Sequence, residues 1–109
     1  MSASELSDAP FGKKFCDVPG YTDCWVQFKT SGYPRKLRRE VDAADAAGVW
    51  AILTRYIVAS NLRDLAGEVV TPMEDLACLD NVEDAVTLWI NRAFYAFWLV
   101  ELTRPRPNS

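Results

Sequence analysis

The last third of the chain has the strongest helical pattern and therefore constrains the fold most. Between Val82 and Thr103, apolar residues recur at helical spacing and form one wide stripe: Val82, Val86, Trp89, Ile90, Ala93, Ala96, Phe97 and Val100. A stripe of this width is typical of a helix face that packs on a core. Asn81 is a suitable N-cap, and Pro105 cannot continue the helix. The pattern predicts a helix from about Val82 to Thr103.

The same helix carries a second apolar stripe on the side that would face water on a surface helix. It consists of Leu88, Phe94, Tyr95, Trp98 and Leu102. Two interpretations are open: the helix is the central element of the domain and is covered on two sides, or the second stripe is exposed and binds another protein. Large exposed apolar patches are rare on monomers, and Trp and Tyr dominate interface energetics. These five residues are therefore candidate protein-binding residues.

The N-terminal half contains a candidate β-hairpin. Residues 23–30 alternate, with Cys24, Val26 and Phe28 on one side, which is the period-two pattern of a strand. Gly and Pro in residues 31–34 are typical of a turn. Residues 35–41 either return as the second strand or open the next helix early. We favour the hairpin.

Two further helices are predicted between the hairpin and the C-terminal helix. Residues 42–61 carry apolar side chains at helical spacing, with Asp42 as the N-cap and Asp45 in the first turn. Residues 73–79 suit a short helix, because Pro72 fits the first helical position. The residues between these helices contain Gly67 and are expected to form a connection.

These elements define the predicted organisation of the chain. The fold class is mainly α (α+β), with a short N-terminal β-hairpin followed by two longer helices and one short helix. The size of the chain, 109 residues, favours a single domain. We place this domain at residues 11–103, between flexible tails at residues 1–10 and 104–109 that have little to bury.

The residue types argue against catalysis and against a metal site. The chain has no histidine, which is the commonest general base and neutral metal ligand. Cys16, Cys24 and Cys78 lack zinc-site spacing, and an odd, scattered set does not indicate a disulfide framework. No phosphate-binding loop motif is present. We therefore predict a protein that is not an enzyme, needs no cofactor or metal, and keeps its thiols reduced.

The distribution of apolar residues suggests a soluble protein. No apolar run reaches the roughly 18 residues that a membrane span requires. The polar, acidic N-terminus lacks the basic and apolar regions of a secretory signal. The expected location is the cytoplasm, where reduced thiols are usual.

The charge of the chain is divided unevenly. Residues 1–39 carry seven Lys/Arg and four Asp/Glu, whereas residues 40–109 carry five and eleven. The basic excess is concentrated in one short run: Arg35, Lys36, Arg38 and Arg39. Such a run is typical of a solvated face, of a contact with an acidic protein surface or a neighbouring copy, or of single-stranded nucleic acid binding. The acidic pI of about 4.8 makes nucleic acid the least favoured partner, so these residues are a secondary protein-contact candidate.

Three segments together suggest a family. The run WVQFKTSGYPRKLRRE at residues 25–40 precedes a helix, the run IVASNLRDLAGEVV follows at residues 57–70, and an apolar C-terminal helix closes the chain. This layout resembles the tail assembly chaperones of long-tailed bacteriophages, in size and element order over roughly residues 15–103. The family has no catalytic signature to compare, so the resemblance carries over no site residue.

The resemblance implies a specific role. Such proteins bind the tape-measure protein, bring tail-tube subunits to it during tail morphogenesis, often form homo-oligomers, and are absent from the finished virion. For a phage-encoded protein the location would be the host cell cytoplasm. Two alternatives stay open: a structural head–tail or minor tail component retained in the virion, and a small nucleic-acid-binding or regulatory module that uses the basic hairpin.

Overall fold

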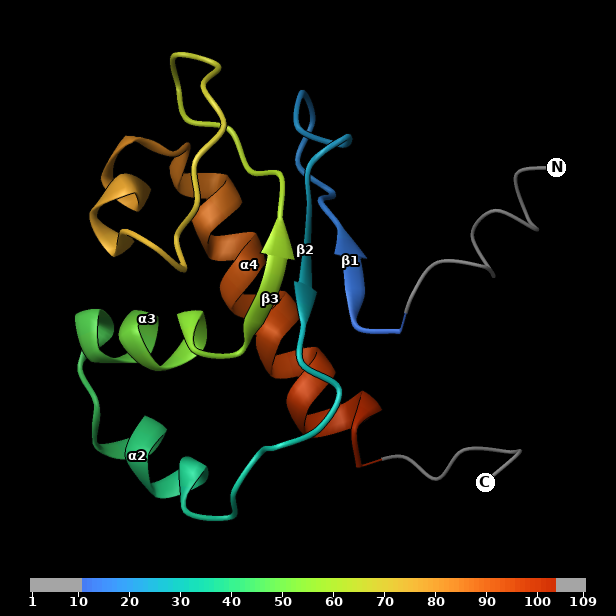
Figure 1. The fold of residues 1–109 in the computed structure, drawn as a ribbon, viewed down its shortest axis with the longest axis vertical. Helices are drawn as coiled ribbons and strands as arrows, with labels where there is room; N and C mark the ends of the chain where they lie inside the picture. Colours follow the sequence, from blue (N-terminus) through green and yellow to red (C-terminus); the bar gives the residue numbers. More distant parts are fainter. Residues whose placement is uncertain (1–10, 104–109) are drawn as a thin grey trace, which may run out of the picture.

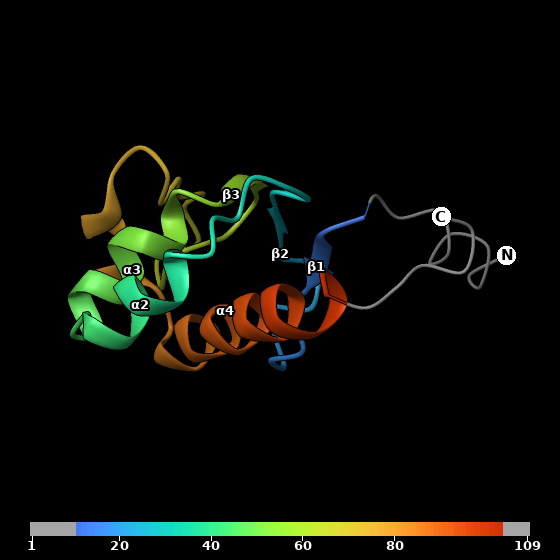
Figure 2. The ribbon, with the colours of Figure 1, turned by 90° about the horizontal axis from the view of Figure 1, so that it is seen from below.

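The computed structural model describes residues 11–103, and both predicted tails lie outside the described residues. In chain order its elements are β1 (Lys13–Phe15), β2 (Trp25–Phe28), α2 (Leu37–Ala43), α3 (Ala46–Thr54), β3 (Ile57–Ser60), a 3₁₀-helix (Leu76–Asn81), α4 (Asp84–Ala96) and a π-helical turn (Phe97–Glu101). The long α4 lies along one face of the small sheet (Figures 1 and 2). Strands and helices both contribute, so the α+β class is confirmed.

The sheet has three antiparallel strands in the order β1-β2-β3. Val26, at the centre of β2, faces Lys14 on one side and Ser60 on the other. Val26 and Phe28 are fully buried, so the predicted alternation in residues 23–30 is confirmed. The chain enters β1 through Gly12, whose φ of +89° and close approach to the Phe28 carbonyl exclude a Cβ atom. The middle strand is thus anchored in the core by its own alternating side chains.

The predicted second strand of the hairpin, residues 35–41, is wrong. Residues 37–43 form α2 instead, and β2 pairs with β1 and β3, which come from more distant parts of the chain. The helix begins just after Pro34, whose carbonyl accepts a hydrogen bond from Leu37 N at 3.0 Å. Leu37 is fully buried and Val41, one turn later, packs against the core. A single apolar row at helical spacing therefore anchors the basic segment as a helix.

The predicted helix at residues 42–61 is wrong at both ends. Helix α3 covers only Ala46–Thr54, and its N-cap is Asp45, whose carboxylate accepts from Gly48 N at 2.8 Å. Asp42 lies inside α2 instead of capping a helix. After a turn the chain continues as β3, Ile57–Ser60, in which β-branched residues suit a strand that pairs with β2. The two partner strands of β2 are thus residues 13–15, for which no element is predicted, and the end of the predicted helix at residues 42–61.

The connection before α4 also differs from the prediction. The short helix is a 3₁₀-helix at Leu76–Asn81, displaced from residues 73–79, and it is capped by the Asp75 carboxylate, which accepts from Ala77 N. Asn81 ends this helix and does not cap α4. The N-cap position of α4 is Glu83, which makes no side-chain capping bond.

The C-terminal helix is confirmed, but it widens at its end. After Ala96 the backbone forms a π-helical turn, in which Leu102 N donates to Phe97 O at 2.9 Å. The wider turn rotates the residues that follow it relative to a regular helix. Val100, predicted to lie on the core face, is accordingly exposed, as is Ala96. The other bulky members of the predicted core stripe are buried: Val82, Val86, Trp89, Ile90 and Phe97.

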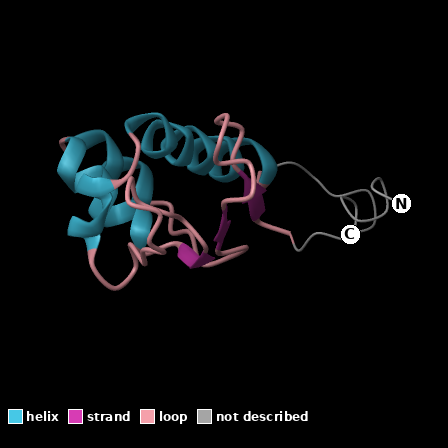
Figure 3. Cartoon of the chain, turned by 90° about the horizontal axis from the view of Figure 1, so that it is seen from above, coloured by secondary structure: helices cyan, strands magenta, loops and turns pink. Residues whose placement is uncertain are grey.

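Helix α4 is covered on two sides. On the sheet side, the Phe28 ring lies 5.5 Å from Phe94 and 5.8 Å from Phe97. On the side of the short helices, the Phe94 ring lies 6.3 Å from Tyr56 and 6.4 Å from Tyr33. Figure 3 shows the strands along the long helix and the short helices beside one of its ends. The interpretation of α4 as the central element is therefore the correct one over most of its length.

Two substitutions on α4 test this arrangement. Phe94→Ala should lower the free energy of unfolding by about 3–5 kcal/mol, because it empties a fully buried site. Leu88→Ala, on the same helix, should change it by no more than about 0.5 kcal/mol, since Leu88 is 56% exposed. Urea denaturation followed by circular dichroism measures both. Equal losses in the two variants would contradict the placement of α4.

Candidate functional site

The C-terminal end of α4 and the start of α2 enclose the best candidate for a binding surface. Two adjoining pockets of about 540 and 380 Å³ lie here, and both are lined by Arg38 and Trp98. We call them together the α2–α4 groove. The side chains that define it are Arg35, Arg38, Tyr95, Trp98, Leu99 and Leu102.

Helical spacing explains why these side chains meet. Arg35 lies in the turn that leads into α2 and Arg38 in the first turn of the helix, and a hydrogen bond from Arg38 N to Arg35 O at 3.4 Å holds the two residues close together. On the other wall, Tyr95 and Leu99 are four residues apart across the junction of α4 and the π-helical turn. The groove is thus formed by the turn that leads into α2 and the first residues of α2 on one side, and by the C-terminal end of the long helix on the other.

The groove is positively charged at its α2 edge. Within residues 11–103, no carboxylate pairs with any member of the basic run Arg35, Lys36, Arg38 and Arg39. The nearby Glu40 is paired with Arg55 at 3.1 Å. Asp42 also lines the groove and, after burial, is the second cause that raises the pKa of Tyr95. The rim therefore offers two arginines and one carboxylate around an apolar floor.

The five predicted protein-binding residues of the second stripe differ in their burial. Phe94 is 0% exposed and Trp98 is 6% exposed, so of the two open interpretations the one in which the helix is covered holds for these two residues. The Phe94 ring lies against the stacked rings of Tyr33 and Tyr56, and the Trp98 ring lies 5.5 Å from that of Phe94. Trp98 nevertheless forms part of the groove wall.

The other three members of the stripe keep contact with solvent. Tyr95 and Leu102 are half-buried and line the groove, whereas Leu88 is exposed and does not line it. Leu99, 42% exposed, belongs to the groove but was not predicted. Its spacing of four residues from Tyr95 is the signal that could have identified it.

The four residues of the basic run differ in whether they line the groove. Arg35 and Arg38 line the groove, so the structure joins them to the apolar residues of α4. Lys36 and Arg39 are exposed and lie outside its lining. Part of the basic run and part of the second stripe, which are separate candidates in the sequence, therefore lie on one surface.

Tyr33 forms the inner end of the groove. Its ring stacks on Tyr56 with 4.6 Å between centroids. Its hydroxyl is buried, and no described residue supplies a hydrogen-bond partner. Burial, followed by the proximity of Tyr56, raises the pKa of Tyr33 well above its ordinary value of 10.

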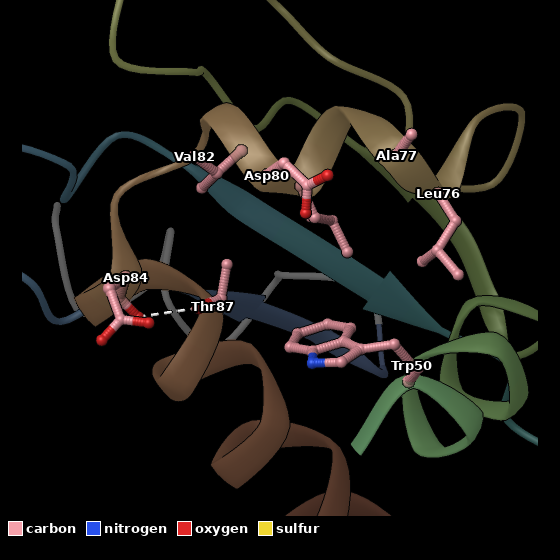
Figure 4. Close-up of a pocket in the computed structure, with 9 residues that line it drawn as sticks. Trp50, Leu76, Ala77, Asp80, Val82, Asp84 and Thr87 are labelled. Atoms are coloured by element: carbon pink, nitrogen blue, oxygen red, sulfur yellow. Dashed lines mark hydrogen bonds between the residues drawn. The ribbon is translucent and has the colours of Figure 1, made fainter. Parts of the chain in front are cut away.

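A separate pocket of about 640 Å³ lies between α3, the 3₁₀-helix and the start of α4 (Figure 4). Trp50 forms one wall, and Leu76 and Val82 add apolar surface opposite (Figure 4). Asp80 and Asp84 also line this Trp50 pocket, and neither pairs with a cation within the described part of the chain. An apolar and acidic pocket suits a side chain that combines an aliphatic stem with a positive charge. No local sequence pattern indicates this pocket, because its walls come from three separate segments.

The described part of the chain contains neither a metal-binding cluster nor a membrane-spanning helix. Across residues 11–103 there is no group of three or more side chains placed to hold a metal ion. In the same range, none of the helices has the length and apolarity needed to cross a bilayer.

Comparison with known proteins gives no match: no family model, no curated protein and no solved structure matches the chain. The resemblance to phage tail assembly chaperones therefore stays a prediction from the sequence.

The buried Tyr33 hydroxyl predicts a distinct pH dependence. Because the folded-state pKa of Tyr33 is raised, the unfolded chain loses this proton first as the pH passes about 10, and stability falls above that pH. Above pH 10, Tyr33→Phe should reduce the fall in the free energy of unfolding by up to about 1.4 kcal/mol per pH unit. At pH 7 the substitution should change the free energy of unfolding by less than about 1 kcal/mol. Urea denaturation at pH 7 and at alkaline pH measures the difference. An unchanged alkaline slope in the variant would contradict the assignment.

Proposed function

We propose that this chain is a non-enzymatic escort that binds an apolar, acidic segment of another protein in the α2–α4 groove. One observation carries the proposal: partly exposed apolar side chains and two arginines without a described carboxylate partner line the same concave surface. A groove of this kind matches the way amphipathic helices are bound by their partners. The site contains no nucleophile or base arrangement that would suggest chemistry instead.

The apolar part of the groove supplies the affinity. Leu99 and the half-buried Tyr95 and Leu102 offer surface that a client can cover. Full burial of an aliphatic side chain contributes about 1.5–3 kcal/mol relative to exposure. Trp and Tyr are the residue types that most often act as anchors at the centre of an interface. A client that places two or three apolar side chains here would bind with useful strength.

The arginines supply the selectivity. A guanidinium group binds a carboxylate through two parallel hydrogen bonds, so Arg35 and Arg38 favour Asp or Glu on the client next to its apolar residues. Charges at the rim of an interface act mainly on association rate and on discrimination between partners. The preferred client is therefore an amphipathic segment with acidic residues beside its apolar face.

Within this proposal, the biological role is that of a bacteriophage tail assembly chaperone. The support is the resemblance drawn from the sequence segments together with a surface suited to a long helical client such as a tape-measure protein. Tail-tube subunits would be the second class of partner, and the host cytoplasm the location. A structural tail component retained in the virion would use the same groove, and its presence in purified particles would distinguish it.

A second copy of the chain is also a partner of suitable chemistry. The Trp50 pocket is apolar and acidic, and the basic edge of α2 has the complementary charge. Contact between these two different surfaces would be head-to-tail, which generates rings or open filaments rather than a closed dimer. We therefore propose homo-oligomers built on this contact.

The binding proposal is tested with synthetic amphipathic peptides of about 20 residues, long enough for several helical turns. Two peptides share the same apolar face and carry either Glu or Lys on the polar face. Fluorescence anisotropy should show tighter binding of the Glu peptide. Arg35→Glu/Arg38→Glu should weaken it at least tenfold, about 1.4 kcal/mol.

The matched control is Lys36→Glu/Arg39→Glu, which changes the net charge equally but lies outside the groove lining. It should weaken binding no more than about threefold, as expected for charges that act only at long range. Equal effects of the two double variants, or equal affinity for both peptides, would contradict the groove as the binding site. Tighter binding of a single-stranded oligonucleotide, lost steeply with salt, would favour the nucleic-acid alternative.

A further inference from the structure

Two cysteines that are eight positions apart in the sequence face each other at the end of the β1–β2 ladder. Phe15 pairs with Trp25, and one further step of this register brings Cys16 opposite Cys24. The backbone confirms the step, because Cys16 N donates a hydrogen bond to Cys24 O at 2.9 Å. The ladder thus continues past β1 and ends at this pair.

The geometry of the ladder places both side chains on the same face. Residues directly opposite each other in an antiparallel pair share a face of the sheet. Cys16 is 4% exposed and Cys24 is 1% exposed, so both thiols point into the core. Opposed antiparallel residues have Cα atoms about 4.5–5.5 Å apart, which lies within the 4.4–6.8 Å that a disulfide spans. Both thiols are free in this structure.

We propose that Cys16 and Cys24 form an oxidisable pair that closes into an intramolecular disulfide when the protein meets a small-molecule disulfide such as oxidised glutathione. In the first step, the thiolate of one cysteine attacks glutathione disulfide, and one reduced glutathione leaves. In the second step, the other cysteine, as thiolate, attacks the mixed disulfide, and a second reduced glutathione leaves. The chain loses two electrons and two protons, and the reagent is reduced by the same amount.

The reaction requires strand β1 to separate locally from β2. In the closed state the Cys16 thiol accepts a hydrogen bond from Val18 N at 3.4 Å, and burial raises its pKa, which keeps the reactive thiolate scarce. Strand β1 has only three residues and lies at the edge of the sheet. Short edge elements are the parts of a fold that open most easily. Oxidation should therefore be slow, and the disulfide should form as the strand closes again.

The disulfide would tie β1, which contacts the C-terminal turn of the long helix, to β2. Lys14 of β1 is paired with Glu101 of the π-helical turn, and Phe11 packs on Phe97 with 5.2 Å between ring centroids. Through these contacts β1 holds the last turn of the C-terminal helix. A covalent link between β1 and β2 would prevent β1 from separating from β2 and would stabilise the contact between β1 and the C-terminal turn.

The test uses the full chain incubated with oxidised glutathione, followed by alkylation of free thiols and tryptic digestion. Cleavage after Lys14 and Lys29 places both cysteines on one peptide, residues 15–29, whereas Cys78 lies on another. The expected product is peptide 15–29 with no alkyl group and a mass lower by two hydrogen atoms. Cys78→Ala should give the same product. Cys24→Ala should never give it.

Stability provides a second, independent readout. The closed form should keep the circular dichroism spectrum of the reduced form and melt roughly 10 °C higher, because the cross-link lowers the conformational entropy of the unfolded chain. Peptide 15–29 alkylated at both cysteines after long exposure to the oxidant would overturn the proposal. A disulfide that forms only in urea and yields a protein that melts below the reduced form would overturn it as well.

Discussion

The packing of Phe94 is the contact on which the rest of the structure depends. Its ring meets Phe28 of the sheet on one side and Tyr33, Tyr56 and Trp98 on the other. One side chain of α4 therefore joins the three-stranded sheet to the short helices. A three-stranded sheet with one open face has little core of its own, so α4 supplies the apolar surface on which every other element is organised.

The sequence predicts those elements whose signal is local. Strand β2 is visible in the alternation around Val26, and α4 in its long helical stripe. The partners of β2 are not visible, because strand pairing depends on which distant segments reach the same edge. The strands at residues 13–15 and 57–60 are too short to show a period. The helix at residues 37–43 has one buried residue, Leu37, which is too little to show an apolar face in the sequence.

The candidate site was predicted in two separate halves. Arg35 and Arg38 came from the charge distribution, and Tyr95 and Leu102 from the second stripe of the C-terminal helix. Their convergence follows from the path of the chain around α4, which no local pattern encodes. The burial of Phe94 and Trp98 escaped prediction for the same reason, because helical periodicity shows that a face is apolar but not what covers it.

The central claim, that a client binds in the α2–α4 groove, is tested most directly by ¹⁹F NMR on protein labelled with 5-fluorotryptophan. Trp98 reports on the groove and Trp50 on the acidic pocket, while Trp25 lies on the sheet and Trp89 in the core. Addition of an acidic amphipathic peptide should shift the Trp98 resonance and leave that of Trp25 in place. A shift of Trp25 with an unchanged Trp98 resonance would contradict the account.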